Sequence, residues 1–164
     1  MRLRAFALLA LAACASTVHR SAARSDVARA ESDEGARADV LAVVRRLFDA
    51  MRTGDSAALR STLAPEVVLV SVTDRPGAPP FVVDSMEAFV RAVGTPHPEV
   101  WDERTSNEIV HVDGRLAVVW ADYAFYLGSR FMHCGVDTFQ LVRMPAGWKI
   151  VALADTRRRE GCTQ

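Results

Sequence analysis

The chain has 164 residues, half of them hydrophobic, and this length suits one domain with a short additional segment. Its 20 basic and 20 acidic residues balance, so the charge gives no reason to expect a nucleic-acid partner. No stretch reaches the roughly 18 to 20 consecutive apolar residues of a membrane-spanning helix, so no such helix is expected.

Residues 1–13 have the pattern of an export signal. The start, MRLR, carries two arginines, and the run AFALLALAA is apolar but too short to span a membrane. The sequence LAAC at residues 11–14 resembles a bacterial lipobox, which implies cleavage before Cys14 and a lipid on its sulfur. Cleavage after Ala15 and an organelle transit peptide are the alternatives. We therefore expect an exported protein, either lipid-anchored to the cell envelope and facing the periplasm, or secreted.

Residues 14–36 separate this signal from the folded part. They are mostly small and polar, and we predict a flexible tether, with a loose additional helix as the alternative because alanine is frequent. The folded domain is expected over residues 37–164.

Three helices and a strand are predicted in the first half of this domain. Apolar residues recur every three or four positions over residues 38–53, which is typical of a helix with one apolar face, and Gly54 ends it. Asp55 or Ser56 caps a short second helix. EVVLVSVTD then predicts a strand, and a third helix over residues 86–93 is capped by Asp84 or Ser85.

The second half is predicted to form four antiparallel strands joined by tight turns. The strands are NEIVHV, RLAVVWADYAFYL, RFMHCGVDTFQLVR and WKIVALADTRR, and the turns contain Asp113-Gly114, Gly128-Ser129 and residues 144–147. Helices followed by such a sheet indicate an α+β fold with the helices on one face of a curved, mainly antiparallel sheet.

The turn at Gly128-Ser129 predicts which side chains share a face, because register fixes the facing of a strand. A two-residue loop without irregularity places Ala124 opposite His133. The predicted inner face then combines acids, a histidine and aromatic rings: Trp120, Asp122, Tyr126, His133, Asp137 and Phe139. Such a set is typical of a small-molecule site, although a buried histidine and acids bonded to Arg130 or to the backbone are the plainer interpretation.

Two features leave this register open. Gly135 lies in mid-strand, where a bulge would change the side on which Asp137 lies. The last hairpin turns Asp155 outward with a four-residue loop and inward with a five-residue loop. The opposite, more apolar face is expected to form a homodimer interface or to pack under the tether.

Cys134 and Cys162 are expected to form a disulfide. An oxidising compartment permits such a bridge, and a chain that folds back near Gly161 can bring the two sulfurs together. His133 is not expected to activate Cys134, because adjacent strand residues point to opposite faces.

The element order, together with HCGVDTFQLVRMPAGWKIVALADTRRREGC, resembles the nuclear transport factor 2-like superfamily. Within it, the chain is similar to small exported bacterial members called SnoaL-like or lumazine-binding-like, over about residues 37–162. The resemblance implies a cone of three N-terminal helices on a curved, mainly antiparallel sheet, and often a dimer. Some relatives are isomerases, dehydratases or cyclases, and many are binding or accessory domains.

Three functions follow from this interpretation. In the first, the cone binds a small apolar or aromatic molecule between Trp120, Tyr126 and Phe139. In the second, an enzyme of the isomerase, dehydratase or cyclase type uses Asp122 or Asp137 as base. His133 or Tyr126 then acts as acid or oxyanion donor. In the third, a non-catalytic domain dimerises. None of them implies a dedicated cofactor, a metal ion or a nucleic acid.

Overall fold

The computed structural model describes the backbone of residues 12–73 and 75–162, and side chains from residue 33 onward within these ranges. The chain divides into two compact units, Met1–Gly35 and Ala36–Gln164. Helix α1 (Ala12–Thr53) begins in the first unit and ends in the second. The predicted signal peptide falls almost wholly outside the described residues, and so does the side chain of Cys14.

The segment predicted as an irregular tether has a helical backbone, as in the alternative of an additional helix. Its composition explains the difference, because alanine, arginine and glutamate are strong helix formers. None of the helices that the structure describes is long and apolar enough to cross a membrane.

The end of α1 and the starts of α2 and α3 lie where their local signals predict. The last turns of α1 bury Val44, Leu47 and Phe48, and α1 ends before Gly54, whose φ of 69° suits a residue without a side chain. Helix α2 (Ser56–Thr62) is capped by Asp55, which accepts hydrogen bonds from two backbone N–H groups. Helix α3 (Met86–Gly94) is capped by Ser85, whose hydroxyl accepts one hydrogen bond from the backbone N–H of Ala88.

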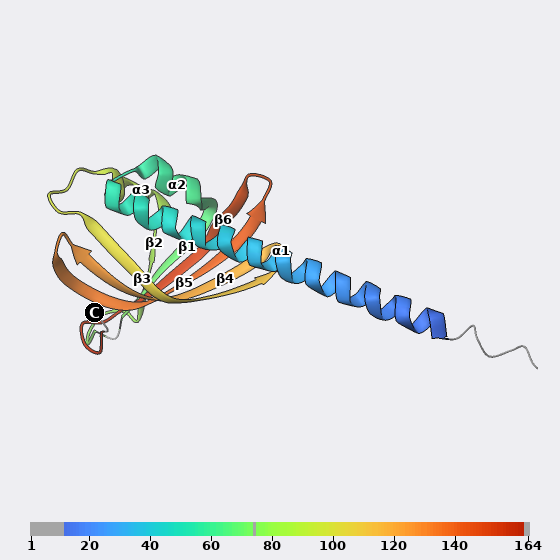
Figure 1. Ribbon diagram of the computed structural model, residues 1–164. Helices are drawn as coiled ribbons and strands as arrows, with labels where there is room; N and C mark the ends of the chain where they lie inside the picture. Colours follow the sequence, from blue (N-terminus) through green and yellow to red (C-terminus); the bar gives the residue numbers. More distant parts are fainter. Residues whose placement is uncertain (1–11, 74, 163–164) are drawn as a thin grey trace, which may run out of the picture. The chain divides into compact units, whose positions relative to one another are not determined.

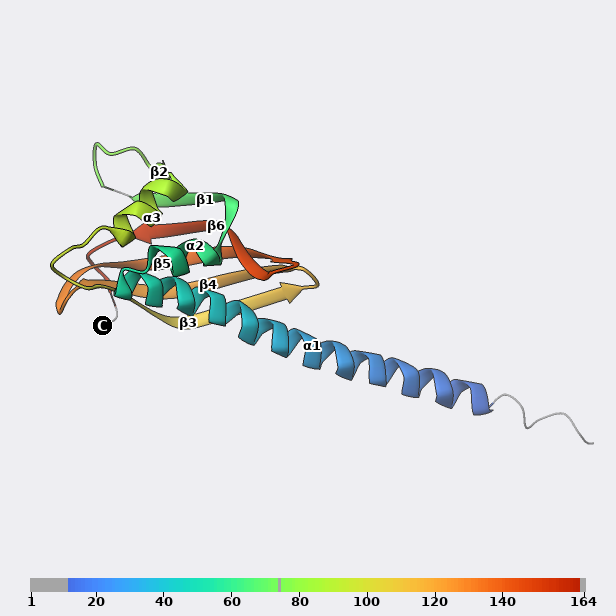
Figure 2. The same ribbon diagram turned by 90° about the horizontal axis from the view of Figure 1, so that it is seen from above.

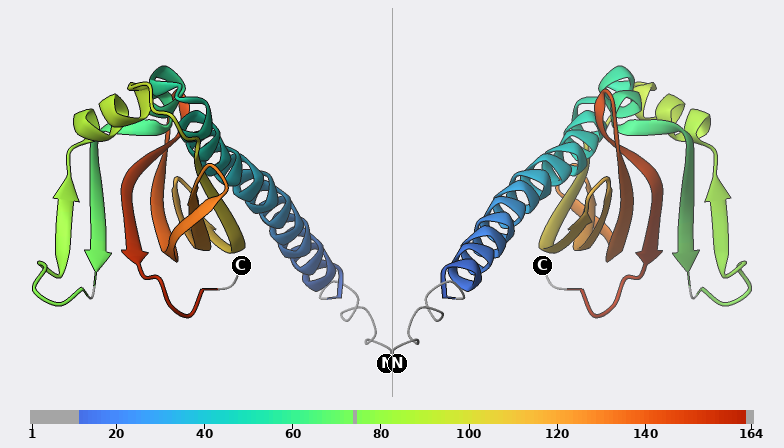
Figure 3. Two further views of the ribbon diagram at one scale, coloured as in Figure 1. Left: turned by 90° about the vertical axis from the view of Figure 1, so that its left-hand side faces the viewer. Right: turned by 90° about the vertical axis from the view of Figure 1, so that its right-hand side faces the viewer.

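One six-stranded sheet completes this unit, in the order β2-β1-β6-β5-β4-β3. Its strands are β1 (Leu63–Thr73), β2 (Phe81–Asp84), β3 (Trp101–Asp113), β4 (Leu116–Leu127), β5 (Arg130–Met144) and β6 (Gly147–Arg157). Among the strands that the structure describes, only β1 and β6 pair in parallel. Figures 1 and 2 show the sheet bending beneath α2, α3 and the end of α1, and Figure 3 shows β1 and β2 side by side at one edge. The predicted α+β class is confirmed; β2 was not predicted.

The turn at residues 128–129 is as predicted, but the register beyond it is not. Leu127 lies opposite Arg130, and the pairing then shifts by one residue, so that Phe125 rather than Ala124 lies opposite His133. The extra residue is Met132 on β5, a β-bulge close to the turn. Because strand side chains alternate, this shift splits the predicted inner set between the two faces of the sheet.

The inner face of the sheet packs against the helices at one end and opens into a pocket at the other. Phe139, Leu141 and Ile150 are fully buried in the core, and the Phe139 ring meets the edge of Phe48 with centroids 6.0 Å apart. Core packing therefore fixes the face on which the alternate residues of β5 lie.

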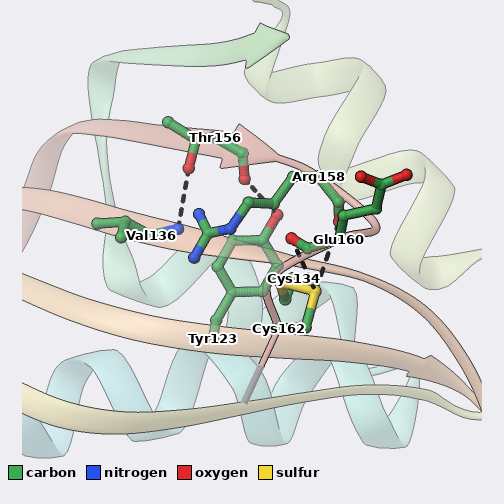
Figure 4. The surroundings of a disulfide bond; sticks show 7 residues. All are labelled: Tyr123, Cys134, Val136, Thr156, Arg158, Glu160 and Cys162. Atoms are coloured by element: carbon green, nitrogen blue, oxygen red, sulfur yellow. Dashed lines mark hydrogen bonds between the residues drawn. A yellow bond between two sulfur atoms is a disulfide. The ribbon is translucent and has the colours of Figure 1, made fainter. Parts of the chain in front are cut away.

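The predicted disulfide between Cys134 and Cys162 is present, with Cα atoms 5.8 Å apart (Figure 4). Cys134 and Arg158 also exchange two backbone hydrogen bonds of 2.9 Å, which continue the β5–β6 pairing beyond β6. The bridge thus fastens the chain after β6 to the outer face of β5.

Candidate functional site: a helix-covered pocket with paired carboxyl groups

A pocket of about 550 Å³ lies between the inner face of the sheet and the helices. Its walls are mainly apolar and aromatic and come from α1, α3 and the strands: Leu47, Phe48, Met51, Leu69, Val70, Ala88, Phe89, Ala92, Trp101, Phe125, Leu127 and Leu153. Its polar side chains are Ser71, Asp84, Glu103, Tyr123, His133, Asp137, Asp155 and Arg157. An apolar cavity with a few polar groups is the usual form of a small-molecule site.

Strand register gathers the polar groups at one end of this pocket. Asp137 on β5 lies opposite Asp155 on β6, and Ser71 on β1 lies on the other side of Asp155. His133 and Arg157 lie on the same faces of their strands as these acids, because residues at even spacing point to the same side. The sheet therefore presents neighbouring acidic and basic side chains from three strands.

Asp155 forms an ion pair and accepts several hydrogen bonds. Arg157 Nε donates to its Oδ2 at 2.6 Å, and the hydroxyl of Ser71 donates to its Oδ1 at 2.7 Å. Arg157 also donates to Ser71 Oγ at 2.8 Å. Burial opposes the charge of Arg157, but the bonds with Asp155 raise the pKa of its guanidinium. The carboxyl group of Asp155 is thus already engaged by Arg157 and Ser71, and the guanidinium balances its charge.

Glu103 and Asp137 form a second pair, whose negative charge is less well balanced than that of Asp155. They come from β3 and β5, and their carboxyl groups share a hydrogen bond across β4. Burial raises the pKa of Glu103 to about 7, although the hydrogen bond with Asp137 lowers it. Burial and the neighbouring Glu103 raise the pKa of Asp137 well above its ordinary value. The pair therefore holds a proton at a pH at which exposed carboxyl groups have lost theirs.

The buried atoms around this pair are incompletely hydrogen-bonded. Asp137 is 1% exposed, and its Oδ2 has no hydrogen-bond partner among the described donors. His133 Nδ1 is also buried without a partner. Burial and then Arg157 lower the pKa of His133, so the imidazole is neutral at pH 7. Unsatisfied polar atoms of this kind are uncommon in protein interiors, and here both belong to residues that line the pocket.

Two aromatic residues hold the imidazole in place. The ring of His133 meets Phe125 and Tyr123 edge-on, with centroids 5.1 and 5.7 Å apart. The Tyr123 hydroxyl donates to the carbonyl of Thr156 at 2.8 Å, and burial and then Asp155 raise its pKa. Tyr123 is therefore a fixed wall of the pocket that carries no charge.

Gly135 allows Tyr123 to lie across β5. A Cβ atom at this position would lie 1.8 Å from the carbonyl oxygen of Thr156 and 2.7 Å from the Tyr123 ring. Only glycine fits between them, so the close approach of β6 to β5 beside the pocket depends on it.

The predicted site residues do not form one group. His133 and Asp137 line the pocket, whereas Phe139 lies in the core beside it. Asp122, Trp120 and Tyr126 lie on the outer face, so the predicted pairing of Asp122 with His133 is wrong. Asp122 instead accepts a hydrogen bond from Asn107 at 2.9 Å.

The other two outer-face residues are ordinary surface side chains. Trp120 is 51% exposed, and the Arg104 guanidinium lies 4.4 Å from the centre of the Tyr126 ring. The bulge at Met132 explains all three misplacements.

Glu103, Tyr123 and Arg157 are pocket residues that the prediction missed. Glu103 falls in the polar run WDERTS, which carries no apolar alternation, and β3 starts six residues before the predicted strand. Arg157 ends the predicted strand WKIVALADTRR, and Tyr123 falls outside the predicted inner set. Among the described residues, no group of three or more His, Cys, Asp or Glu side chains has the geometry of a metal site.

The fold and the pocket define a nuclear transport factor 2-like domain. The profile of the family described as "Putative lumazine-binding" matches residues 35–154, so the chain belongs to this family. No curated protein matches the chain.

Several solved structures share the fold. A nuclear transport factor 2-like protein with a cystatin-like fold from Novosphingobium aromaticivorans has a TM-score of 0.63 and 14% identity over 85% of this chain and 90% of its own. A "putative dehydratase" of the same superfamily from Streptomyces avermitilis has a TM-score of 0.59 and 20% identity over 77% and 98%. A superfamily member from Salmonella enterica has a TM-score of 0.59 and 14% identity over 79% and 96%. These similarities establish the fold.

Proposed function

We propose that this chain is an exported domain that binds a small, largely apolar or aromatic molecule in the helix-covered pocket. The observation that carries the proposal is a cavity of about 550 Å³ with aromatic walls and unsatisfied buried polar atoms at one end. The description of the family names lumazine, a flat bicyclic heteroaromatic compound, and Phe89, Trp101 and Phe125 give the pocket aromatic walls suited to a flat ring.

Native mass spectrometry of the protein isolated from the cell envelope tests this function. We expect a bound small molecule in the natural protein and its loss in Ala92→Phe, which places a ring in the pocket from α3. Ala57→Phe makes the same change on the exposed side of α2 and should keep the molecule. Equal occupancy in the two variants would show that the molecule binds elsewhere.

Export and lipidation at Cys14 belong to the same proposal. The N-terminal sequence supports them, and so does the Cys134–Cys162 disulfide, because such bonds persist in oxidising compartments. Labelling with a palmitate analogue tests the anchor: the label should enter the natural chain and be absent from Cys14→Ala. A labelled Cys14→Ala would contradict lipidation at this residue.

A second candidate function is an isomerase, dehydratase or cyclase in which the Glu103–Asp137 pair moves a proton. The specific observation is the pKa of Glu103 near 7 in an apolar pocket, since a general base works best when its pKa lies close to the working pH. The test is deuterium exchange at the carbon beside the carbonyl of a bicyclic aromatic ketone. The exchange should be fast with the natural protein and abolished by Glu103→Gln; an uncatalysed rate with both excludes this function.

A homodimer through the outer sheet face is also proposed. Ile109, Leu116 and Trp120 are exposed by 50% or more on the outer side of β3 and β4. Exposed apolar patches of this kind mark interaction surfaces. Analytical ultracentrifugation should find a dimer for the natural protein and a monomer for Trp120→Lys; a natural protein that is monomeric throughout would exclude it.

A further inference from the structure

The charged groups around the pocket do not balance. Its carboxyl groups are Asp84, Glu103, Asp137 and Asp155, and its one guanidinium is that of Arg157. The side chains that the helices contribute to the pocket carry no charge, and Tyr123 and His133 are neutral at pH 7. The polar end of the pocket therefore carries an excess of acid.

The guanidinium cannot balance the inner acids because it is already engaged. Arg157 pairs with Asp155 at 2.6 Å, and its side chain is 51% exposed at the mouth of the pocket. Asp137 is 1% exposed and has one oxygen, Oδ2, without a donor. Among the described residues, no basic side chain forms an ion pair with Glu103 or Asp137. A buried carboxylate without a cation is unfavourable, and in the empty pocket a proton takes the place of the cation.

We propose that the ligand of this pocket is an organic cation, an amine or protonated nitrogen base on an aromatic body, whose N–H groups bind Glu103 and Asp137. The inference rests on the proposed binding function and names the class of its ligand. The positively charged nitrogen supplies the donors that the acid pair lacks, and Trp101 and Phe125 are aromatic wall residues, a kind of side chain that favours a neighbouring cation. On binding, the acid pair loses its proton to solvent and the ammonium takes that position.

This assignment has a definite pH signature. A cation favours the ionised form of the pair, so its affinity rises as pH increases through the pKa of Glu103, which is about 7. A neutral ligand that accepts a hydrogen bond from the protonated pair shows the opposite trend. Ligand charge and pH trend therefore separate the two classes.

Isothermal titration calorimetry with three probes of one shape tests the inference: naphthylmethylamine, naphthylmethanol and naphthoate. We expect the amine to bind the natural protein at least roughly ten-fold more tightly than the alcohol near pH 8, and to weaken roughly ten-fold near pH 6. Near pH 6 about one proton should be released for each amine bound, as measured in buffers of different ionisation enthalpy.

Variants assign the effect to the acid pair. Glu103→Gln should weaken the amine roughly ten-fold near pH 8 and leave the alcohol within about two-fold. Glu108→Gln makes the same change at an exposed position of β3 outside the pocket and should leave both unchanged.

The outcomes separate the two proposals. Alcohol or naphthoate binding as tightly as the amine overturns the cation inference and leaves the binding function standing. An amine affinity that falls with rising pH overturns the inference as well. Failure of all three probes to bind contradicts both, because the proposed pocket should accept aromatic bodies of this size.

Discussion

Glu103 on β3 and Asp137 on β5 share a hydrogen bond across the intervening strand β4, inside a pocket whose other walls are mainly apolar. Two carboxyl groups in contact cannot both ionise at low energetic cost, because their negative charges repel and neither is well solvated. The folded protein therefore retains a proton that the unfolded chain releases. This relationship links stability, ligand choice and any proton chemistry at the site.

The stability of the protein should fall as pH rises from about 4.5 to about 8 because of this pair. The ordinary pKa of Glu103 is 4.5 and its folded value is about 7, so between these values the folded state binds more protons than the unfolded state. The free energy of unfolding then decreases with rising pH. Glu103→Gln removes the contribution of Glu103 to this slope and should be more stable than the natural protein by about 3 kcal/mol near pH 8, with the difference vanishing near pH 4.

Urea unfolding at several pH values measures this effect. Asp122→Asn is the control, because Asp122 lies on the outer face and is bonded to Asn107. Its pH slope should match that of the natural protein. If Glu103→Gln has the same slope as this control, the acid pair does not hold the proton that we assign to it.

Side chains on the two faces of the sheet should affect ligand binding differently. His133→Ala removes a pocket wall and a buried nitrogen, so the affinity for naphthylmethylamine should fall roughly ten-fold. Trp120→Ala and Asp122→Ala change the outer face and should leave the affinity within about two-fold. Calorimetry on the three variants decides the point. A loss of affinity in Asp122→Ala would instead support the smooth register without the bulge at Met132.

Gly135→Ala should be strongly destabilising. The added methyl group would lie 1.8 Å from the carbonyl oxygen of Thr156, so the backbone of β5 or β6 must move. We expect a loss of about 3 kcal/mol or more in the free energy of unfolding.

The matched control is Gly35→Ala. It adds the same methyl group in α1, where no atom lies within 4 Å, and should be neutral or slightly stabilising. Comparable unfolding curves for the two variants would be incompatible with the contact between Tyr123, Gly135 and β6.

Loss of the disulfide should lower the free energy of unfolding, but the protein should still fold. Cys134 and Cys162 are separated by 28 positions, and closing a loop of this length stabilises a protein by roughly 3 kcal/mol in the chain-entropy account. Cys162→Ser should therefore unfold at a lower urea concentration than the natural protein.

A reducing agent provides the internal control for this prediction. It should shift the natural protein to the midpoint of Cys162→Ser and leave the variant unchanged. A natural protein whose midpoint does not respond to full reduction would show that the bridge contributes no stability.

The elements of the fold could be predicted from local signals. Asp55, Ser85 and Gly54 mark helix ends through their caps, and the tight turn at Gly128-Ser129 fixes the start of the β4–β5 hairpin. Each of these signals lies within a few residues of the feature that it predicts. This is why element order and fold class follow from the sequence.

The composition of the site could not be predicted in the same way. The bulge at Met132 has no marker residue, and aromatic side chains occur on both faces of β4, so periodicity does not reveal which face is inner. Trp120 and Tyr126 are as aromatic as Tyr123 and Phe125, yet they lie on the outer face. The packing of Phe139 and its neighbours against the helices decides which face of the sheet is the inner one. This packing depends on residues that are distant in the sequence.

Carbon-detected NMR titration of the side-chain carboxyl groups of Glu103 and Asp137 tests the shared proton most directly. We expect the Glu103 carboxyl to titrate near pH 7 and the Asp137 carboxyl to titrate well above its ordinary pKa. Titration of both groups near pH 4, as in exposed carboxyl groups, would contradict the shared proton and the pocket chemistry derived from it.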